Sequence, residues 1–293
     1  MEGNCILLCN GIYKSFASTR ALVDVSIEIN KGEIRGLIGE NGSGKSTLSS
    51  IIAGAQKADK GSMVYRGQAY NPATMVQAQQ QGVSMIVQEM GTVPGISVAS
   101  NIFLGKLNLF SKGGIFRPAA MNRAARKILE EIGASEIDPA AMIDTLTFED
   151  RKIVEIARAM YIQPELLIVD ETTTALASKG RGVLYKIIEK QKAQNKAVLF
   201  ISHDLEELME ICTHVTVLRD GVIITTMNKQ QMTIPDMRRN MVGRELTGNY
   251  YRGDYDGSHS PEVVLEMRRV TNDTIIENFD LKLHKGELLG IGG

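Results

Sequence analysis

Nine consecutive residues constrain the fold of this chain more than any other part of its sequence. The segment GENGSGKST fits the phosphate-loop pattern G-x-x-x-x-G-K-[ST], and it follows an apolar stretch, Ile34 to Ile38, that predicts a strand. In such a loop the backbone N–H groups attract phosphate oxygens. A chance glycine-rich turn would rarely match the whole string between a strand and a helix. The segment predicts a nucleotide-binding loop made of Gly39, Glu40, Asn41, Gly42, Ser43, Gly44, Lys45, Ser46 and Thr47.

Two side chains of this loop have separate expected roles. Lys45 supplies a positive charge for the outer phosphates of the nucleotide, and Ser46 is expected to hold a magnesium ion. The loop leads into a predicted helix from Lys45 to Ala53, which presents its positive N-terminal end to the same ligand.

The composition is that of an ordinary globular protein. The chain has 293 residues, 43% of them hydrophobic, which suggests about two domains. The formal net charge is -1, so nothing indicates a nucleic acid or an acidic membrane surface as the main partner. The sequence has no apolar run near the roughly 18 residues of a membrane span and no signal-peptide pattern, so we expect the chain to stay in the cytosol.

The three cysteines are expected to be buried small apolar residues. Cys5, Cys9 and Cys212 are odd in number and form no C-x-x-C pair. This spacing argues against a disulfide framework and against a zinc site.

Polar residues follow two further apolar runs where the predicted strands end. Leu166 to Val169 ends in the pair Asp170 and Glu171, and Ala197 to Ile201 is followed, after one serine, by His203. Buried parallel strands bind ligands outside their carboxyl ends, so these residues are candidates for a shared site. A solvated turn is the alternative for the acidic pair, and the apolar run before it argues against that alternative.

The remaining patterns predict an α/β fold with a mostly parallel sheet. Two strands before the loop, Ile6 to Ile12 and Leu22 to Ile29, are expected to form an N-terminal antiparallel β subdomain. A helical subdomain, about residues 95–162, is expected to be inserted into the core. Its predicted helices are Val98 to Gly105, Met121 to Gly133 and Asp150 to Tyr161.

The two ends of the chain repeat each other. Asp24 to Gly39, DVSIEINKGEIRGLIG, aligns without gaps on Asn278 to Gly293, NFDLKLHKGELLGIGG, with five identities in the same frame. Gly293 would then be the first glycine of a second phosphate loop, and we expect the chain to be a fragment of a tandem protein. The expected divisions are a first domain at 1–246, a polar linker at 247–261 and the N-terminal strands of a second, incomplete domain at 262–293.

The order of these motifs resembles that of the ATP-binding subunits of ABC transporters, and the resemblance covers the whole chain. It rests on Lys45, the pair Asp170 and Glu171, and His203 in this order. Further matches are Gln88 in SMIVQEM, Phe16 in YKSF, and VLRDG at Val217 to Gly221. A narrower resemblance is to the tandem ATPases of monosaccharide importers of the ribose, galactose and xylose type. It rests on the duplicated architecture, on SVASNIFLG at Ser97 to Gly105 and on VEIARAM at Val154 to Met160.

The resemblance implies a P-loop NTPase fold that binds ATP and Mg²⁺, with a role for each site residue. Asp170 would support the metal together with Ser46 and Gln88. Glu171 would polarise the attacking water as a general base. His203 and Gln88 would contact the γ-phosphate region and sense whether it is present.

Alternatives remain for three of these positions. Phe16 is expected to stack on adenine, whereas without the resemblance it would be read as a core aromatic. His203 alone could be an ordinary polar residue at a strand end. Gln88 adjoins Glu89, which is the local alternative for a metal or water contact.

The sequence departs from the family pattern at the signature segment. Where an LSGGQ-like motif should precede VEIARAM, the chain has LTFED at Leu146 to Asp150. In family members this segment caps the ATP held by the other domain. Thr147 could still donate a hydroxyl, but Glu149 and Asp150 would place two carboxylates near a polyphosphate, where like charges repel.

A second departure follows the acidic pair. Thr172 stands where the family usually has proline, and Ala177 or Ser178 stands where many members have aspartate. The resulting hypothesis is that the loop of the first domain, with Lys45 and Glu171, works against the signature of the second domain. LTFED would then face a weaker second site.

The resemblance implies an energy-coupling subunit that hydrolyses ATP to import a monosaccharide, or a related small sugar or nucleoside. It would lie at the cytoplasmic face of the membrane as a peripheral subunit. Its partners would be transmembrane permease subunits, the second ABC domain of the same full-length chain and, indirectly, an extracytoplasmic sugar-binding protein. The segment from Glu89 to Lys106 would line the groove that docks a permease helix, with plain linker and core helix as its alternative.

Two other functions are alternatives to this one. A soluble tandem ABC protein acting on ribosomes would usually have a long charged linker and intact signatures, which this chain lacks. A nucleotide-binding subunit without turnover is disfavoured by the intact Lys45, Ser46, Asp170 and Glu171. The chain alone lacks the signature of its partner domain, so we expect it to hydrolyse ATP weakly or not at all.

Overall fold

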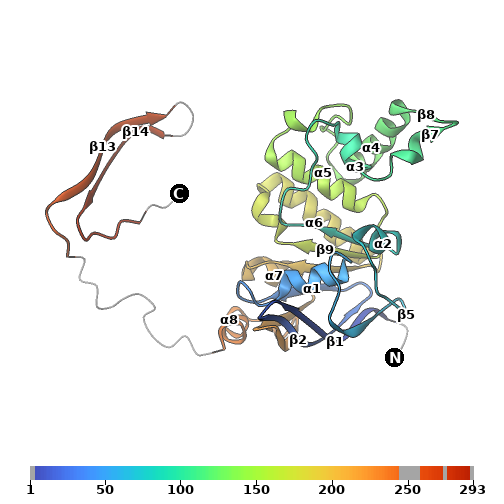
Figure 1. Ribbon diagram of the computed structural model, residues 1–293, viewed down its shortest axis with the longest axis horizontal. Coiled ribbons are helices and arrows are strands. Elements are labelled where there is room, and N and C mark those ends of the chain that lie inside the picture. Colours follow the sequence, from blue (N-terminus) through green and yellow to red (C-terminus); the bar gives the residue numbers. More distant parts are fainter. Residues whose placement is uncertain (1–3, 244–257, 273–275, 291–293) are drawn as a thin grey trace. The chain divides into compact units, whose positions relative to one another are not determined.

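The computed structural model describes residues 4–243, 258–272 and 276–290 (Figure 1). The chain divides into two compact units, Met1–Arg244 and Glu245–Gly293. Within the described ranges, no helix combines the length and the apolar character needed to cross a membrane.

A six-stranded sheet forms the centre of the first unit. Its strand order is β12-β11-β3-β10-β9-β6, and all neighbouring pairs are parallel except β11 with β12. Every residue of β3, β9 and β10 is buried, because the sheet is covered on both faces, and this accounts for their unbroken apolar runs. The strands are β3 Ile34–Ile38, β6 Val83–Ile86, β9 Leu166–Asp170, β10 Ala197–Ile201, β11 His214–Arg219 and β12 Val222–Asn228.

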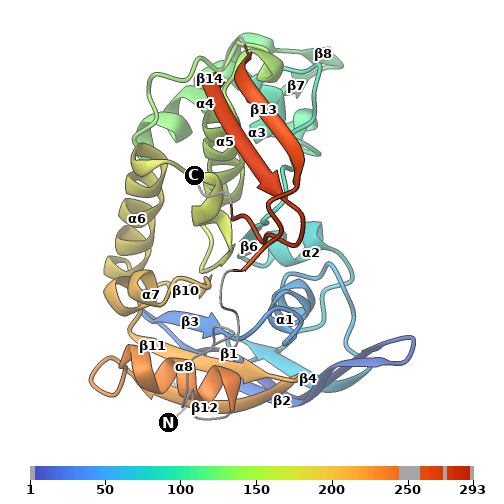
Figure 2. The same ribbon diagram turned by 90° about the vertical axis from the view of Figure 1, so that its left-hand side faces the viewer.

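An antiparallel sheet of order β2-β1-β4-β5 covers one face. Helix α1, Lys45–Ile52, lies between the two sheets (Figure 2), where its Leu48 and Ile51 share a core with Leu37 of β3 and Ile27 of β2. The strands of this second sheet are β1 Cys5–Phe16, β2 Thr19–Asn30, β4 Lys60–Tyr65 and β5 Gln68–Ala69. The predicted N-terminal antiparallel subdomain is therefore present, and β1 is longer than expected.

Helices cover the other face of the central sheet. Along β9, Val169 packs in a core with Phe103, Leu129 and Ile153, whereas Ile168 belongs to the core beneath the antiparallel sheet. The helices of this face are α3 Val98–Ile102, α4 Pro118–Ile132, α5 Phe148–Met160, α6 Ser178–Ala193, α7 Leu205–Ile211 and α8 Ile234–Val242. Helix α2, Met75–Gln80, buries its Ala78 in the core beneath the antiparallel sheet instead. Three 3-10 turns, Leu107–Phe110, Ile143–Thr145 and Thr172–Ala175, and a hairpin of β7 Ser111–Lys112 and β8 Ile115–Phe116 complete the unit.

The three predicted helices of the inserted region are present with different ends. The first ends at Ile102 rather than Gly105, which has a positive φ of 75°. The second begins at Pro118, a residue suited to the first helical turn because it needs no N–H partner there. The third begins at Phe148, two residues early, because Thr147 caps it.

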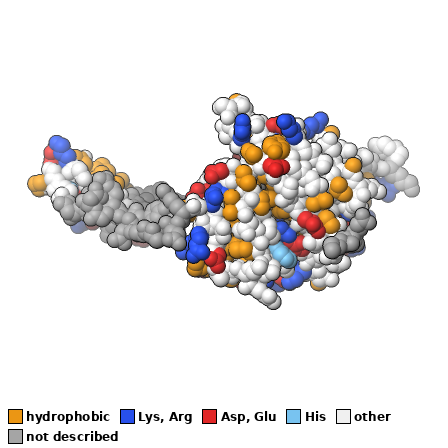
Figure 3. Space-filling model, turned by 90° about the horizontal axis from the view of Figure 1, so that it is seen from below, with side chains coloured by type: hydrophobic (Ala, Val, Ile, Leu, Met, Phe, Trp, Pro, Cys, Tyr) orange, Lys and Arg blue, Asp and Glu red, His pale blue; other side chains and the backbone are white. Residues whose placement is uncertain are grey.

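The face of the first unit shown in Figure 3 mixes charges. Lysine, arginine, aspartate and glutamate side chains are scattered among hydrophobic and other residues, and the described residues of that face show no broad area of one sign. This distribution agrees with the nearly balanced charge of the sequence.

The second unit contains the antiparallel pair β13 Val263–Asn272 and β14 Ile276–His284. Its last turn reproduces one in the first unit. Glu33 Oε2 accepts from the Asn30 backbone N–H at 2.8 Å, and Glu287 Oε2 accepts from the His284 N–H at 2.7 Å. The repeated glutamate thus closes the same turn twice. Gly293 and most of the predicted linker, residues 247–257, lie outside the described residues.

Candidate nucleotide site

The carboxyl ends of four parallel strands meet at one edge of the central sheet. Ile86 pairs with Val169, and Ile201 pairs with both Asp170 and Leu37. Each strand is followed by one of the predicted site segments, so the fold brings these segments to one edge. They are Gln88 after β6, Asp170 and Glu171 at the end of β9, His203 after β10, and the loop from Gly39 after β3.

The loop wraps around the lysine at its end. Lys45 is buried, and its Nζ donates to the carbonyl oxygens of Gly39 at 2.9 Å and Glu40 at 3.1 Å. No side chain caps the first turn of α1, and that turn has no acidic residue. The N–H groups and the positive end of the helix dipole therefore lie beside the Lys45 ammonium, which is the electrostatic arrangement that binds phosphate.

Two glycines are required where other strands press on the loop. A Cβ on Gly39 would overlap the carbonyl oxygen of Leu218, and one on Gly44 would lie 2.5 Å from the carbonyl oxygen of Ala21. Gly44 also has a φ of 106°, which an L side chain rarely adopts. Because Ala21 lies in β2, the β1–β2 hairpin is packed directly against the loop.

A buried carboxylate lies beside the start of α1. Asp170 Oδ2 accepts from Ser49 Oγ at 3.3 Å, and Oδ1 is buried with no hydrogen-bond partner among the described residues. Burial raises the pKa of Asp170, as does the charge of Glu171, while hydrogen bonds from Ser49 and Ser46 oppose the rise. An unpartnered carboxylate oxygen near a serine hydroxyl supplies the hard oxygen ligands that Mg²⁺ prefers, so these residues fit the predicted metal.

Glu171 adopts a left-handed backbone conformation, with a φ of 43°. Its N–H donates to the carbonyl oxygen of Ile201 at 3.0 Å, which joins the end of β9 to the end of β10. Its carbonyl accepts from Thr174 Oγ1 at 2.8 Å. A residue seldom found in this conformation is thus held from both sides at the strand end.

A buried glutamate that no sequence pattern indicated connects the segments after β9 and β10. Glu207 Oε2 accepts from Ser202 Oγ at 2.6 Å and from Thr173 Oγ1 at 3.1 Å, while Oε1 accepts from Tyr185 Oη at 2.6 Å. His203 follows Ser202 directly and has an exposed side chain. The carboxylate therefore holds the side chain of Ser202, the residue just before His203.

Phe16 is the last residue of β1 and is 44% exposed. Lys14 Nζ lies 5.4 Å from the centroid of the Phe16 ring and 3.0 Å from Asp59 Oδ1. Phe16 is thus not a core aromatic. Its strand belongs to the hairpin that packs on the phosphate loop through Ala21.

The LTFED segment forms a helix cap. Thr147 Oγ1 accepts from the Asp150 N–H at 3.1 Å and donates to Asp150 Oδ2 at 2.8 Å, while Glu149 Oε1 accepts from the Gly180 N–H at 2.8 Å. The expected repulsion between these carboxylates and a polyphosphate of the other domain stays a prediction. Both carboxylates have partners within the chain: Asp150 accepts from the Thr147 hydroxyl, and Glu149 accepts from an N–H in the first turn of α6.

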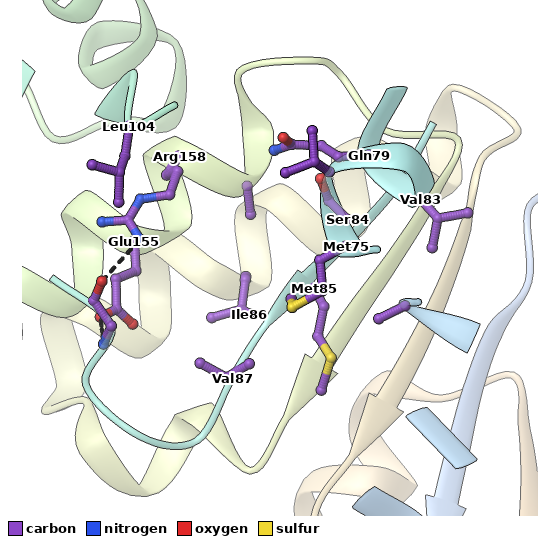
Figure 4. Close-up of a pocket in the computed structure, with 14 residues that line it drawn as sticks. Met75, Gln79, Val83, Ser84, Met85, Ile86, Val87, Leu104, Glu155 and Arg158 are labelled. Carbon is purple, nitrogen blue, oxygen red and sulfur yellow. Dashed lines mark hydrogen bonds between the residues drawn. The ribbon is translucent and has the colours of Figure 1, made fainter. Parts of the chain in front are cut away.

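A groove of about 340 Å³ lies beside the loop that carries Gln88 (Figure 4). Most of its lining residues are apolar, and its two charged residues, Glu155 and Arg158, both hydrogen-bond the backbone of Gly91. Leu104 belongs to the segment predicted to dock a permease helix. The lining residues are Ala53, Met75, Val76, Gln79, Val83, Ser84, Met85, Ile86, Val87, Gly91, Leu104, Glu155, Arg158 and Ala159.

Curated relatives match nearly all of this chain. "Ribose import ATP-binding protein RbsA 2" of Burkholderia pseudomallei (strain 1710b) is 35% identical over 295 residues, covering 98% of this chain and 56% of the relative. A putative ribose/galactose/methyl galactoside import ATP-binding protein of Halalkalibacterium halodurans is 34% identical, covering 96% of this chain and 53% of the relative. The chain spans about half the length of the curated relatives it matches.

Solved structures share the fold. The ADP conformation of MJ1267, an ATP-binding cassette of an ABC transporter, superposes with a TM-score of 0.69 at 27% identity, covering 82% of this chain and 99% of that one. A nucleotide-free ATP-binding cassette from an ABC transporter gives 0.66 at 26% identity, covering 82% of this chain and 96% of that one. The ABC transporter family matches residues 22–174, which span the phosphate loop and the end of β9. The chain belongs to the ABC transporter family.

Proposed function

We propose that this chain is the ATP-binding and hydrolysing part of a subunit that energises import of a monosaccharide, or a related small sugar, through a separate membrane permease. The observation that supports this most is the meeting of the phosphate loop, Asp170 and Glu171 at one edge of the sheet. The ribose-import relatives support the class of substrate. Which sugar is carried depends on the permease and its binding protein.

The loop and the hairpin next to it would bind the nucleotide. Loop N–H groups and the Lys45 ammonium would contact phosphate oxygens, with the ammonium exchanging its carbonyl partners for them. The exposed ring of Phe16 would stack on adenine. Ser46, Gln88 and Asp170 would hold Mg²⁺. When bound, the ion neutralises part of the phosphate charge.

Hydrolysis needs a water aligned with the γ-phosphate. Glu171 would polarise that water as general base, and its backbone is fixed by Ile201 and Thr174. His203, next to the Ser202 hydroxyl that Glu207 holds, would contact the γ-phosphate from the end of β10, and Gln88 would do so from the end of β6.

The groove is the proposed docking site for a permease helix. Met75, Val76 and Leu104 are 41%, 58% and 41% exposed there, so the groove offers apolar surface that an amphipathic helix could cover. The subunit would act at the cytoplasmic face of the membrane as a peripheral protein. A second ABC domain in the full-length chain would supply the signature opposite Lys45, and LTFED would face the weaker site.

Three variants of the full-length protein test this assignment. Glu171→Gln should abolish steady-state ATP hydrolysis while nucleotide binding persists, and replacing Leu146–Asp150 with LSGGQ should barely change the rate. Lys45→Ala should weaken ATP binding, measured by titration with a fluorescent nucleotide. A large gain in rate from the restored LSGGQ would contradict the assignment of LTFED to the weaker site. Unchanged hydrolysis in Glu171→Gln would contradict the proposed general base.

A further inference from the structure

One lysine of α5 is wholly buried at the loop that carries Gln88. Lys152 is 0% exposed, and its Nζ donates to the carbonyl oxygens of Val87 at 2.8 Å, Gln88 at 3.3 Å and Glu89 at 3.0 Å. It also donates to Glu155 Oε2 at 2.8 Å. Three consecutive carbonyls of one loop therefore converge on a single ammonium.

Two more side chains of α5 hold the far end of the same loop. Glu155 Oε1 accepts from the Gly91 N–H, and Arg158 Nη1 donates to the Gly91 carbonyl oxygen at 2.9 Å. Lys152, Glu155 and Arg158 are spaced by three residues, so they lie along one side of the helix. Residues 87–91 belong to no helix or strand, and these bonds fasten both of their ends to α5.

The chemistry of this contact selects lysine. An ammonium has three donors in a tetrahedral arrangement, which suits several carbonyls grouped around one point. A planar guanidinium would direct its donors differently, and an apolar side chain would leave buried carbonyls without partners. A buried charge is also tolerated only when it is paired and hydrogen-bonded, as Lys152 is by Glu155.

We propose that Lys152 is a positioning residue that couples the position of Gln88 to the position of helix α5. The inference rests on the proposed role of Gln88 in hydrolysis. Val87 and Gly91 line the apolar groove, as Glu155 and Arg158 do (Figure 4). The loop at 87–91 therefore borders the groove and also carries Gln88, which follows β6 at the sheet edge where the phosphate loop lies. A displacement of α5 therefore carries Gln88 with it, and Lys152 transmits that displacement without touching the nucleotide.

The test compares Lys152→Met and Lys152→Gln with a matched exposed lysine, Lys127→Met on α4, whose side chain is 78% exposed. In the 293-residue chain, amide hydrogen exchange at 88–91 should rise about tenfold or more in Lys152→Met, while exchange in β9 and β10 stays unchanged. In the full-length protein, kcat should fall about tenfold with the KM for ATP changed less than about threefold. Lys152→Gln keeps two donors and should give intermediate values.

The controls separate this inference from the proposed function. Gln88→Ala, measured in parallel, should lower kcat in the full-length protein. If Gln88→Ala has no effect, the proposed role of Gln88 is wrong. Hydrogen exchange alone then tests whether Lys152 holds the loop at 87–91. The positioning role of Lys152 is overturned if Gln88→Ala lowers kcat while both Lys152 variants have the same amide exchange at 88–91 and the same kcat as Lys127→Met. General unfolding of Lys152→Met would raise exchange in β9 and β10 as well, and Lys152→Gln then decides.

Discussion

The carboxylate of Glu149 should stabilise the start of α6, a helix to which it does not belong. The N-cap position of α6 is Ala177, no side chain within the helix caps it, and its first turn contains no acidic residue. Glu149, from the start of α5, accepts from the N–H of Gly180, the third residue of α6, at 2.8 Å. It therefore takes the place of the missing cap.

The cost of removing this carboxylate can be worked from those contacts. Loss of an N-cap acceptor costs about 1 kcal/mol, and loss of a negative charge at a helix N-terminus costs about 0.3–1 kcal/mol more. Glu149→Ala should thus lower the free energy of unfolding by about 1.5 kcal/mol. In a domain of 150–250 residues this corresponds to a fall in Tm of about 3–6 °C. Glu149→Gln keeps an acceptor without the charge, so its Tm should lie between those of Glu149→Ala and the wild type.

Thermal unfolding followed by circular dichroism measures the effect. The matched control is Glu131→Ala, whose ion pair with Lys127 is exposed and spans 3.8 Å, so its loss should cost less than about 0.5 kcal/mol. Equal Tm values for Glu149→Ala and Glu131→Ala would refute the capping role. The LSGGQ replacement also removes Glu149, so its ATPase rate should be compared well below the lowered Tm.

Two further predictions follow from titrating groups. A hydrogen bond from Lys14 lowers the pKa of Asp59, with a further contribution from the backbone N–H next to it. The stabilisation from Asp59 is then present above the pKa of the unfolded chain and is lost as the pH falls through the lowered pKa of the folded protein. The difference in Tm between wild type and Asp59→Asn should therefore narrow from pH 6 to pH 3. A gap independent of pH would contradict this. Burial raises the pKa of Cys9 and of Cys212 to about 12, so iodoacetamide at pH 8 should modify Cys5 first, as mass spectrometry of the peptides can show. Modification of Cys9 as fast as Cys5 would contradict their burial.

The sequence was informative where a local pattern determined the structure. The apolar runs of β3, β9 and β10 are buried strands, and the polar residues after them meet at one edge because parallel strands end together. The repeated Lys-Gly-Glu string also has a local cause, since Glu33 and Glu287 each close a turn within three residues. The S/T-x-x-D spacing in TFED is likewise a capping signal, and Thr147 and Asp150 form that cap in the structure.

Contacts between distant segments could not be predicted in this way. Lys152 and the carbonyl of Val87 are 65 positions apart, and Glu207 and Thr173 are 34 apart. Charged residues in amphipathic helices usually face solvent, so nothing in the local pattern marks Lys152 or Glu207 as buried. Their partners are mostly backbone carbonyls and hydroxyls, which leave no trace in the sequence. The packing of α5 and α7 on the sheet reveals them.

The crowding around the phosphate loop has a consequence for reading a saturation-mutagenesis library. Substitutions at Gly39 and Gly44 collide with Leu218 and Ala21, so they should reduce the amount of folded protein whatever the loop binds. Gly42 has open space around its Cβ position and only a positive φ of 82°, so asparagine or aspartate there should leave abundance near normal. A screen for the abundance of folded protein, made without nucleotide, would therefore separate Gly39 and Gly44, which the fold requires, from Gly42, which it does not. Intolerance at Gly39 would then say nothing about phosphate contact.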